Sequence, residues 1–165
     1  MRTKFLEGNQ IVSAIIPADL SAAANDGDWF NLKNFGRVLA VLFKAAGTAG
    51  QDPIFTLRQA QDVAGTGAKA LNFTTIWKKV GLQTGIGPFT KVVQAAANTY
   101  IDDTSAEVQA ILAVEILAEE LDVANGFTCI QLQIPDVGLN AQVGCGFYLG
   151  LNPVHASETS LDAIT

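Results

Sequence analysis

The sequence has few charged side chains for a soluble domain. Asp, Glu, Lys and Arg make up 16% of its residues, whereas about 25% is usual, and hydrophobic residues make up 49%. A folded chain with so few charges exposes apolar and small side chains, and such surface commonly becomes an interface. We therefore expect a protein that packs against other proteins, with an unusually well-buried small domain as the alternative.

The sequence also lacks most of the residues on which nucleophilic catalysis and metal binding depend. Its only histidine, His155, follows the last predicted strand, where nothing rigid would orient it as a base. The two cysteines, Cys129 and Cys145, are too few for a complete zinc site or a disulfide framework. Both lie in apolar runs, which predicts buried free thiols, with one bridge between neighbouring strands as the alternative. We expect no enzyme activity and no cofactor.

Short motifs that resemble reactive sites lack the surrounding pattern. Residues 65–70 (GTGAKA) lack the phosphate-loop spacing and a strand–helix frame, so they predict a connection between strands. Neighbouring acidic residues on a strand point to opposite faces, which argues against a catalytic carboxylate pair at Asp102/Asp103 or Glu119/Glu120. Residues 25–28 (NDGD) offer oxygen atoms to a cation but lack the rest of a calcium loop.

The charge pattern indicates which partners to expect. The net charge is −6 and the ten basic residues are scattered, whereas nucleic-acid binding requires clustered Lys and Arg. No apolar run reaches the length of a membrane helix, and Glu7, Asn9 and Gln10 interrupt any signal-peptide core. We expect neither direct nucleic-acid binding nor membrane insertion.

Hydrophobic periodicity predicts a mainly β protein. Short runs of branched and aromatic residues, several of them alternating with polar ones, are separated by Gly- and Pro-containing turns. The predicted strand-like runs are residues 29–35, 37–44, 54–60, 71–77, 89–93, 127–134 and 143–151. In the last of these, Gly144, Gly146 and Gly150 leave room for close backbone packing. We predict a single antiparallel β-sandwich, jelly-roll-like, over residues 29–153, followed by a flexible tail over residues 154–165.

Residues 108–121 are ambiguous between strand and helix. Ala, Leu and Glu favour a helix by propensity, but Val108, Ala110, Leu112, Val114 and Ile116 alternate with other residues as in a strand. Because the flanking segments are β, we predict a strand through about Leu117 and then a short helical turn, placing one short helix near 117–123.

The N-terminal segment, residues 1–28, is predicted to be an extended arm that precedes the sandwich. Its apolar patch ends at Pro17 and a turn follows at residues 25–28. Such an arm can order on a neighbouring molecule, so deletion of residues 1–20 is expected to leave the fold intact and abolish attachment. The predicted partner-interface residues are Ile11, Val12, Ile15, Ile16, Leu20 and Trp29.

Several motifs resemble small virion structural proteins of tailed bacteriophages. They are the run DWFNLKNFGRV at residues 28–38, the glycine-rich turn at 47–50, and the run QAQDVAGTGAKAL at 59–71. Weaker similarity continues through NGF at 125–127, VG at 137–138 and NA at 140–141. The resemblance covers roughly residues 10–152 and carries no catalytic signature.

This resemblance implies a capsid decoration (cement) protein that binds the major capsid protein lattice and self-associates as a trimer or dimer. The implied location is the capsid surface, after assembly in the host cytoplasm. A tail or neck (head-completion) component is one alternative, favoured if residues 108–121 are helical. A carbohydrate- or receptor-binding β-sandwich using Trp29, Trp77, Tyr100 or Tyr148 is another.

Overall fold

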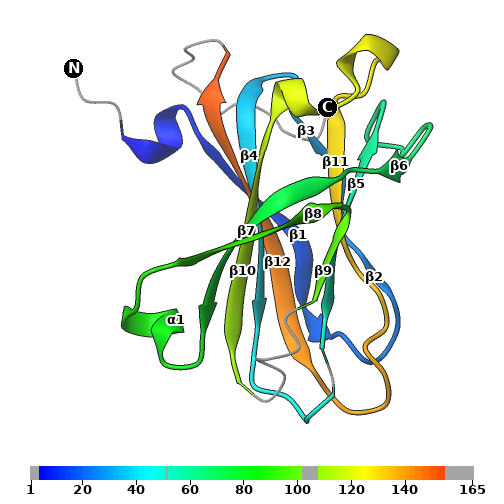
Figure 1. Ribbon diagram of the computed structural model, residues 1–165. Helices are drawn as coiled ribbons and strands as arrows, with labels where there is room; N and C mark the ends of the chain where they lie inside the picture. Colours follow the sequence, from blue (N-terminus) through cyan, green and yellow to red (C-terminus); the bar gives the residue numbers. More distant parts are fainter. Residues whose placement is uncertain (1–3, 51, 102–107, 155–165) are drawn as a thin grey trace.

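The computed structural model describes residues 4–50, 52–101 and 108–154 of the chain (Figure 1). Two antiparallel sheets pack face to face around an apolar core. The larger sheet has the order β1-β12-β4-β10-β7-β8 and the smaller has the order β2-β11-β5-β6, while β3 pairs with β11 and β9 pairs with β5. The strands are β1 (Gln10–Asp19), β2 (Asn25–Asp26), β3 (Phe30–Asn31), β4 (Phe35–Lys44), β5 (Ile54–Ala60), β6 (Lys69–Ala70), β7 (Phe73–Val80), β8 (Thr90–Ala97), β9 (Thr99–Ile101), β10 (Ala110–Leu117), β11 (Cys129–Ile134) and β12 (Val143–Pro153).

The strand pairing is nested, which gives the sandwich a jelly-roll-like topology. The first strand, β1, pairs with the last, β12, and β2 and β3 pair with the next-to-last, β11. Further inward, β4 pairs with β10 and β5 pairs with β9. A long hairpin wrapped across two sheets produces this order. Strands β6 to β8 are inserted between β5 and β9, and β7 and β8 widen the larger sheet beyond β10. The predicted mainly β sandwich is confirmed.

The ambiguous segment at residues 108–121 is a strand followed by helical turns. Strand β10 ends at Leu117, as the sequence predicts, because both its neighbours β4 and β7 provide a ladder for it. Short 3-10 turns follow at η3 (Ala118–Glu120) and η4 (Val123–Asn125). The tertiary context therefore overrides the helix propensity of its Ala, Leu and Glu residues.

Helical structure in the described residues is limited to short turns. Besides η3 and η4, there are η1 (Phe5–Glu7) and α1 (Gln83–Ile86), which lies between β7 and β8. No helix within the described ranges is long and apolar enough to cross a membrane. Most of the tail predicted over residues 154–165, namely residues 155–165 with His155, lies outside the described residues, and so does the pair Asp102/Asp103.

The N-terminal segment differs from its prediction as a separate arm. Residues 10–19 form β1, an edge strand of the larger sheet paired with β12. Ala14, Ile15 and Leu20 are buried in the core. Two register shifts, between Ser13 and Ile15 and between Ile15 and Ala18, interrupt the ladder. These irregularities accommodate Pro17, which lacks an N–H, and they obscure the alternation on which strand prediction depends. The boundary at residue 28 is therefore corrected.

Deletion of residues 1–20 should consequently destroy the fold rather than preserve it. The deletion removes a whole strand and exposes the backbone of β12, in addition to removing the core side chains Ala14, Ile15 and Leu20. Circular dichroism should show loss of the cooperative thermal transition. Deletion of residues 1–9 is the control, because η1 contains no buried residue. A cooperative transition after removal of residues 1–20 would contradict the assignment of β1 to the sandwich.

Residues opposite β12 approach its backbone closely. The inward side of β12 carries Gly144, Gly146, Tyr148 and Gly150, and all four residues are buried. A Cβ atom at Gly146 would lie 2.7 Å from Leu132 Cδ2 on the opposite sheet. Predicted close packing at Gly144, Gly146 and Gly150 is thereby confirmed. The absence of side chains lets the larger residues of the other sheet reach the β12 backbone.

Tyr148 joins the two sheets by hydrogen bonds at the same strand. Its hydroxyl accepts a hydrogen bond from the Leu132 N–H (2.6 Å) and donates one to the Asp28 carbonyl (2.9 Å). Burial raises the pKa of the Tyr148 phenol well above its usual value, so the hydroxyl keeps its proton. The ring itself contacts Phe30. The buried hydroxyl therefore has a partner both as a donor and as an acceptor, and these hydrogen bonds help to hold the sheets together.

Replacement of Gly150 by alanine should destabilise the protein by about 1–3 kcal/mol, the usual cost of overpacking. The new methyl group would lie 2.7 Å from Phe30 Cζ and 2.9 Å from Phe35 Cδ1, and both aromatic side chains are fully buried. Denaturant unfolding measures the change. Gly85→Ala is the matched control, since no atom lies within 4 Å of its Cβ position. Equal stability of both variants would contradict the packing described for β12.

Candidate interaction surface

The six predicted partner-interface residues do not form one surface. Ile15 and Leu20 are core residues, and Val12 packs partly buried against the core. Ile11 and Ile16 are exposed on strand β1. Trp29 is partly exposed elsewhere, beneath the guanidinium of Arg58. Of the predicted set, only Ile11 and Ile16 present exposed apolar side chains.

A larger apolar surface lies on the side of the larger sheet that faces away from the core, which we call the outer face. The ladders align its side chains in three rows across the strands. The upper row is Ile11, Leu149, Leu39 and Glu115. The middle row is Ser13, Phe147, Val41, Ala113, Trp77 and Lys91. The lower row is Cys145, Phe43, Ile111 and Lys79.

Both faces of the larger sheet are therefore apolar. Its inward face supplies core residues such as Val38, Leu42 and Leu112, while the outer face keeps Phe43 and Trp77 exposed at 43% and 37%. The smaller sheet follows the ordinary pattern instead. Its inward residues include Leu57 and Leu132, and the residues between them are polar: Thr56, Arg58, Gln131 and Gln133. An antiparallel sheet with one solvated face should look like the smaller sheet. The larger sheet instead resembles a sheet that is covered on both faces.

A hollow of about 290 Å³ lies within this outer face, between β4, β10, β7 and the start of β8. Leu39, Trp77, Phe89 and Ala113 line it, and none of these residues is charged. Lys79 and Lys91 border it, with their ammonium groups over the rings of Phe89 and Trp77 at 4.8 Å and 5.9 Å from the ring centroids. The hollow fits an apolar side chain from another molecule.

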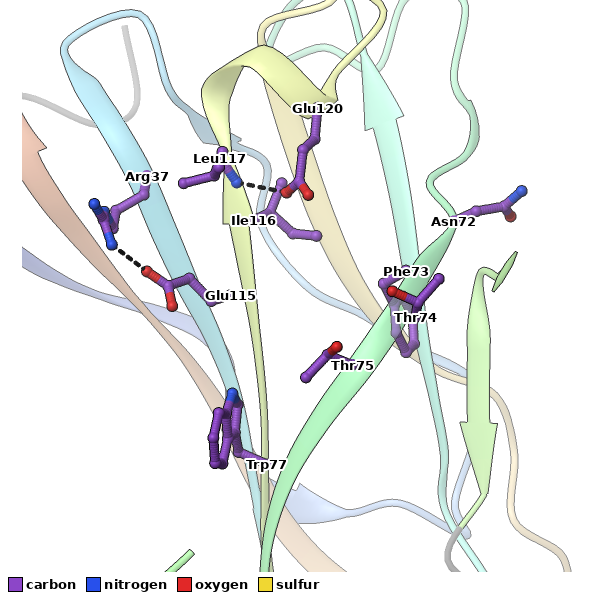
Figure 2. A pocket seen from close by; sticks show the side chains of 10 residues that line it. All are labelled: Arg37, Asn72, Phe73, Thr74, Thr75, Trp77, Glu115, Ile116, Leu117 and Glu120. Carbon is purple, nitrogen blue, oxygen red and sulfur yellow. Dashed lines mark hydrogen bonds and ion pairs between the residues drawn. The ribbon is translucent and has the colours of Figure 1, made fainter. Parts of the chain in front are cut away.

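A larger pocket of about 490 Å³ lies at the upper end of the outer face (Figure 2). Arg37 and Glu115 form an ion pair of 2.8 Å on one side of it, and Trp77 and Thr75 lie below. Glu120 accepts a hydrogen bond from the Leu117 N–H. Both members of the ion pair are more than a third exposed, so the pair contributes at most about 1 kcal/mol to stability.

The connection between β7 and β8 projects beyond the sandwich and carries α1 (Figure 1). Its side chains Leu82 and Ile86 are 87% and 94% exposed. Two such side chains on one short turn form an apolar tip, which we call the α1 tip.

The two cysteines are free, as expected, but they differ in burial. Cys129 is buried on β11, and burial raises the pKa of its thiol. Cys145 is partly exposed and belongs to the lower row of the outer face. The two residues lie in different sheets, which separates their thiols.

The glycine-rich loop at residues 65–70 connects β5 to β6, as expected, and no helix follows it. Asp62 shapes the loop, because its carboxylate accepts hydrogen bonds from the N–H groups of Thr66 and Ala64. These bonds, chiefly the one from Thr66, hold the pKa of Asp62 below its ordinary value. Lys69 pairs with Asp122. The loop is a structured turn whose polar groups bind one another.

The described residues contain no group of three or more His, Cys, Asp and Glu side chains placed to hold a metal ion. At residues 25–28, Asp26 instead accepts a hydrogen bond from Gln133. Comparison of the chain with protein-family models, with curated proteins and with solved structures finds no match.

Proposed function

We propose that this protein is a non-enzymatic virion structural protein, a capsid decoration (cement) protein that binds and stabilises the lattice of the major capsid protein. The observation that carries the proposal is the apolar surface outside the core, which consists of the α1 tip for the lattice and the outer face, with its hollow and few charges, for self-association. Surfaces of this kind serve association with other proteins. In this role the protein assembles in the host cytoplasm and resides on the capsid surface.

The virion context is supported by two analogies. The motifs at residues 28–38 and 59–71 resemble small virion proteins of tailed bacteriophages. Jelly rolls also recur in viral capsid proteins, although a fold alone does not define a function. The alternative of a tail or neck component would be favoured by a helix at residues 108–121, whereas that segment contains the strand β10.

In this proposal the α1 tip makes the contact with the capsid lattice. Leu82 and Ile86 are small, protruding apolar anchors, and burial of each contributes about 1.5–3 kcal/mol. A decoration protein does not need a large contact at each site, because many copies engage a repeating lattice. Self-association of the decoration protein adds further to this avidity.

The double variant L82S/I86S should lose at least about 90% of its occupancy on empty shells of the major capsid protein encoded in the same genome, since two apolar anchors are removed. Co-sedimentation with purified shells measures the occupancy. The control is Val123→Ser, which alters another exposed apolar side chain, in η4 and not in the α1 tip. Failure of the unmodified protein to bind such shells would refute the decoration role.

A carbohydrate-binding role is the second candidate, and the pocket in Figure 2 favours it. Trp77 supplies an aromatic ring on which a sugar can stack, and Arg37, Glu115 and Thr75 supply hydrogen-bonding groups. Such a combination is common in sugar sites, and lectins also use jelly rolls.

If the pocket binds a sugar, a glycan array should identify a ligand, and Trp77→Ala should weaken its binding at least about tenfold through loss of stacking. Isothermal titration calorimetry measures the affinity. Trp29→Ala is the matched control, because Trp29 lies outside this pocket. An array with no bound glycan, or equal affinity of the two variants, counts against the role.

A further inference from the structure

We infer that the outer face is covered by the outer face of a second copy of this chain, with the strands of the two copies running in opposite directions about a two-fold axis. This inference rests on the proposed function in one respect: it identifies the partner of the surface that carries that proposal. Three observations lead to it, namely the arrangement of charges, the shape of the face and its area.

The charges are separated along the strands on the β10-β7-β8 side of the face. Glu115 lies in the upper row and Lys79 in the lower row, on the neighbouring strands β10 and β7. Glu120 also lines the upper pocket and lies above Glu115 (Figure 2). We consider a two-fold axis that lies between the two faces and runs along the middle row, perpendicular to the strands. It places the upper row of one copy opposite the lower row of the other. Lys79 of each copy then lies beside Glu115 of the other, while Lys91, in the middle row on the edge strand β8, lies opposite Lys91 of the other copy.

The alternative two-fold axis, parallel to the strands, produces no such pairing. It would keep each row at its own height and place the β7 side of one copy over the β12 side of the other. Lys79 would then meet Cys145 and Lys91 would meet Ser13, and neither of these partners carries a charge. Burial of an ammonium group without a charged partner is costly. The axis along the middle row is therefore favoured by its two Lys79–Glu115 pairs, which outnumber the single pair of Lys91 side chains at the β8 edge.

The shape of the face agrees with this axis. Exchange of the rows places Phe43 of one copy opposite Leu39 of the other, since both residues lie on β4. Leu39 lines the apolar hollow of about 290 Å³, and Phe43 is an exposed aromatic side chain of a size that can enter it. Because of the two-fold symmetry, each dimer contains this contact twice.

The area is also sufficient. Six strands spaced about 4.8 Å apart, each with about 8 residues at about 3.3 Å per residue, span about 750 Å². A stable interface buries about 800 Å² from each partner. Sheets packed face to face in sandwiches also keep their strands nearly aligned. One second copy is therefore enough to cover the outer face.

Sedimentation velocity of the full chain tests the dimer. The protein should be dimeric at about 10 μM, in the range of ordinary protein interfaces. Phe43→Glu should shift it to a monomer with an unchanged thermal transition, because the Phe43 side chain does not contribute to the core. Val123→Glu introduces the same charge at an exposed apolar site outside the face, and this control should remain dimeric. A monomeric or trimeric wild-type protein would overturn the inference.

Charge exchange tests the direction of the strands. Lys79→Glu and Glu115→Lys should each raise the dimer dissociation constant at least about tenfold, because each places like charges together at two symmetric positions. The double variant K79E/E115K restores opposite charges between the copies and should recover most of the affinity. Absence of recovery would overturn the proposed axis.

Cys145 gives an independent readout without a variant. It lies in the lower row of the outer face, so its alkylation by a maleimide should slow as the protein concentration rises through the dimer dissociation constant. Cys129 is buried in the core and should resist at every concentration. Alkylation of Cys145 at a rate independent of concentration would overturn the inference. A monomer that still decorates shells would refute the dimer alone, whereas a dimer that does not bind shells would refute only the decoration role.

Discussion

The close approach of the two sheets at β12 is the constraint on which the rest of the structure depends. Gly144, Gly146 and Gly150 leave the inward side of that strand almost bare, so Leu20, Leu132 and Phe30 reach its backbone. Tyr148 fills the remaining inward position and uses both hydrogen-bonding capacities of its hydroxyl across the gap. Because β12 pairs with both β1 and β4, the position of this strand also sets the position of the outer face.

The same strand shows why the larger sheet has two apolar faces. Its inward positions are occupied mainly by glycine, whereas Cys145, Phe147 and Leu149 point outward. Much of the hydrophobic side-chain volume of β12 therefore contributes nothing to the core. Apolar surface of this kind is unfavourable for a free protein, because it promotes nonspecific association. This nonspecific association is the cost of leaving the face exposed. A partner that covers the face removes this cost, and the proposed antiparallel dimer supplies such a partner.

Much of the fold can be predicted from the sequence, and the candidate surface much less so. Strands such as β5 and β11 have clear turn signals and periodicity, and the spacing of the β12 glycines is enough to indicate close packing. The strand β1 escapes prediction because Pro17 and two register shifts disturb its alternation. The sequence of β4 contains a further signal: residues 38–43 (VLAVLF) form a continuous apolar run, which is typical of a strand covered on both faces. Which residues share a row depends on the register between distant strands, and the sequence alone does not specify it.

Zero-length cross-linking between isotopically distinct copies tests the central claim most directly. A mixture of ¹⁴N- and ¹⁵N-labelled protein is treated with a carbodiimide, which joins a lysine to a carboxylate only when the two are in contact, and peptides are identified by mass spectrometry. The antiparallel dimer predicts a Lys79–Glu115 link that joins a light peptide to a heavy one. Dimers that cross-link only through other residue pairs would contradict the account, and so would a Lys79–Glu115 link confined to peptides of the same isotope.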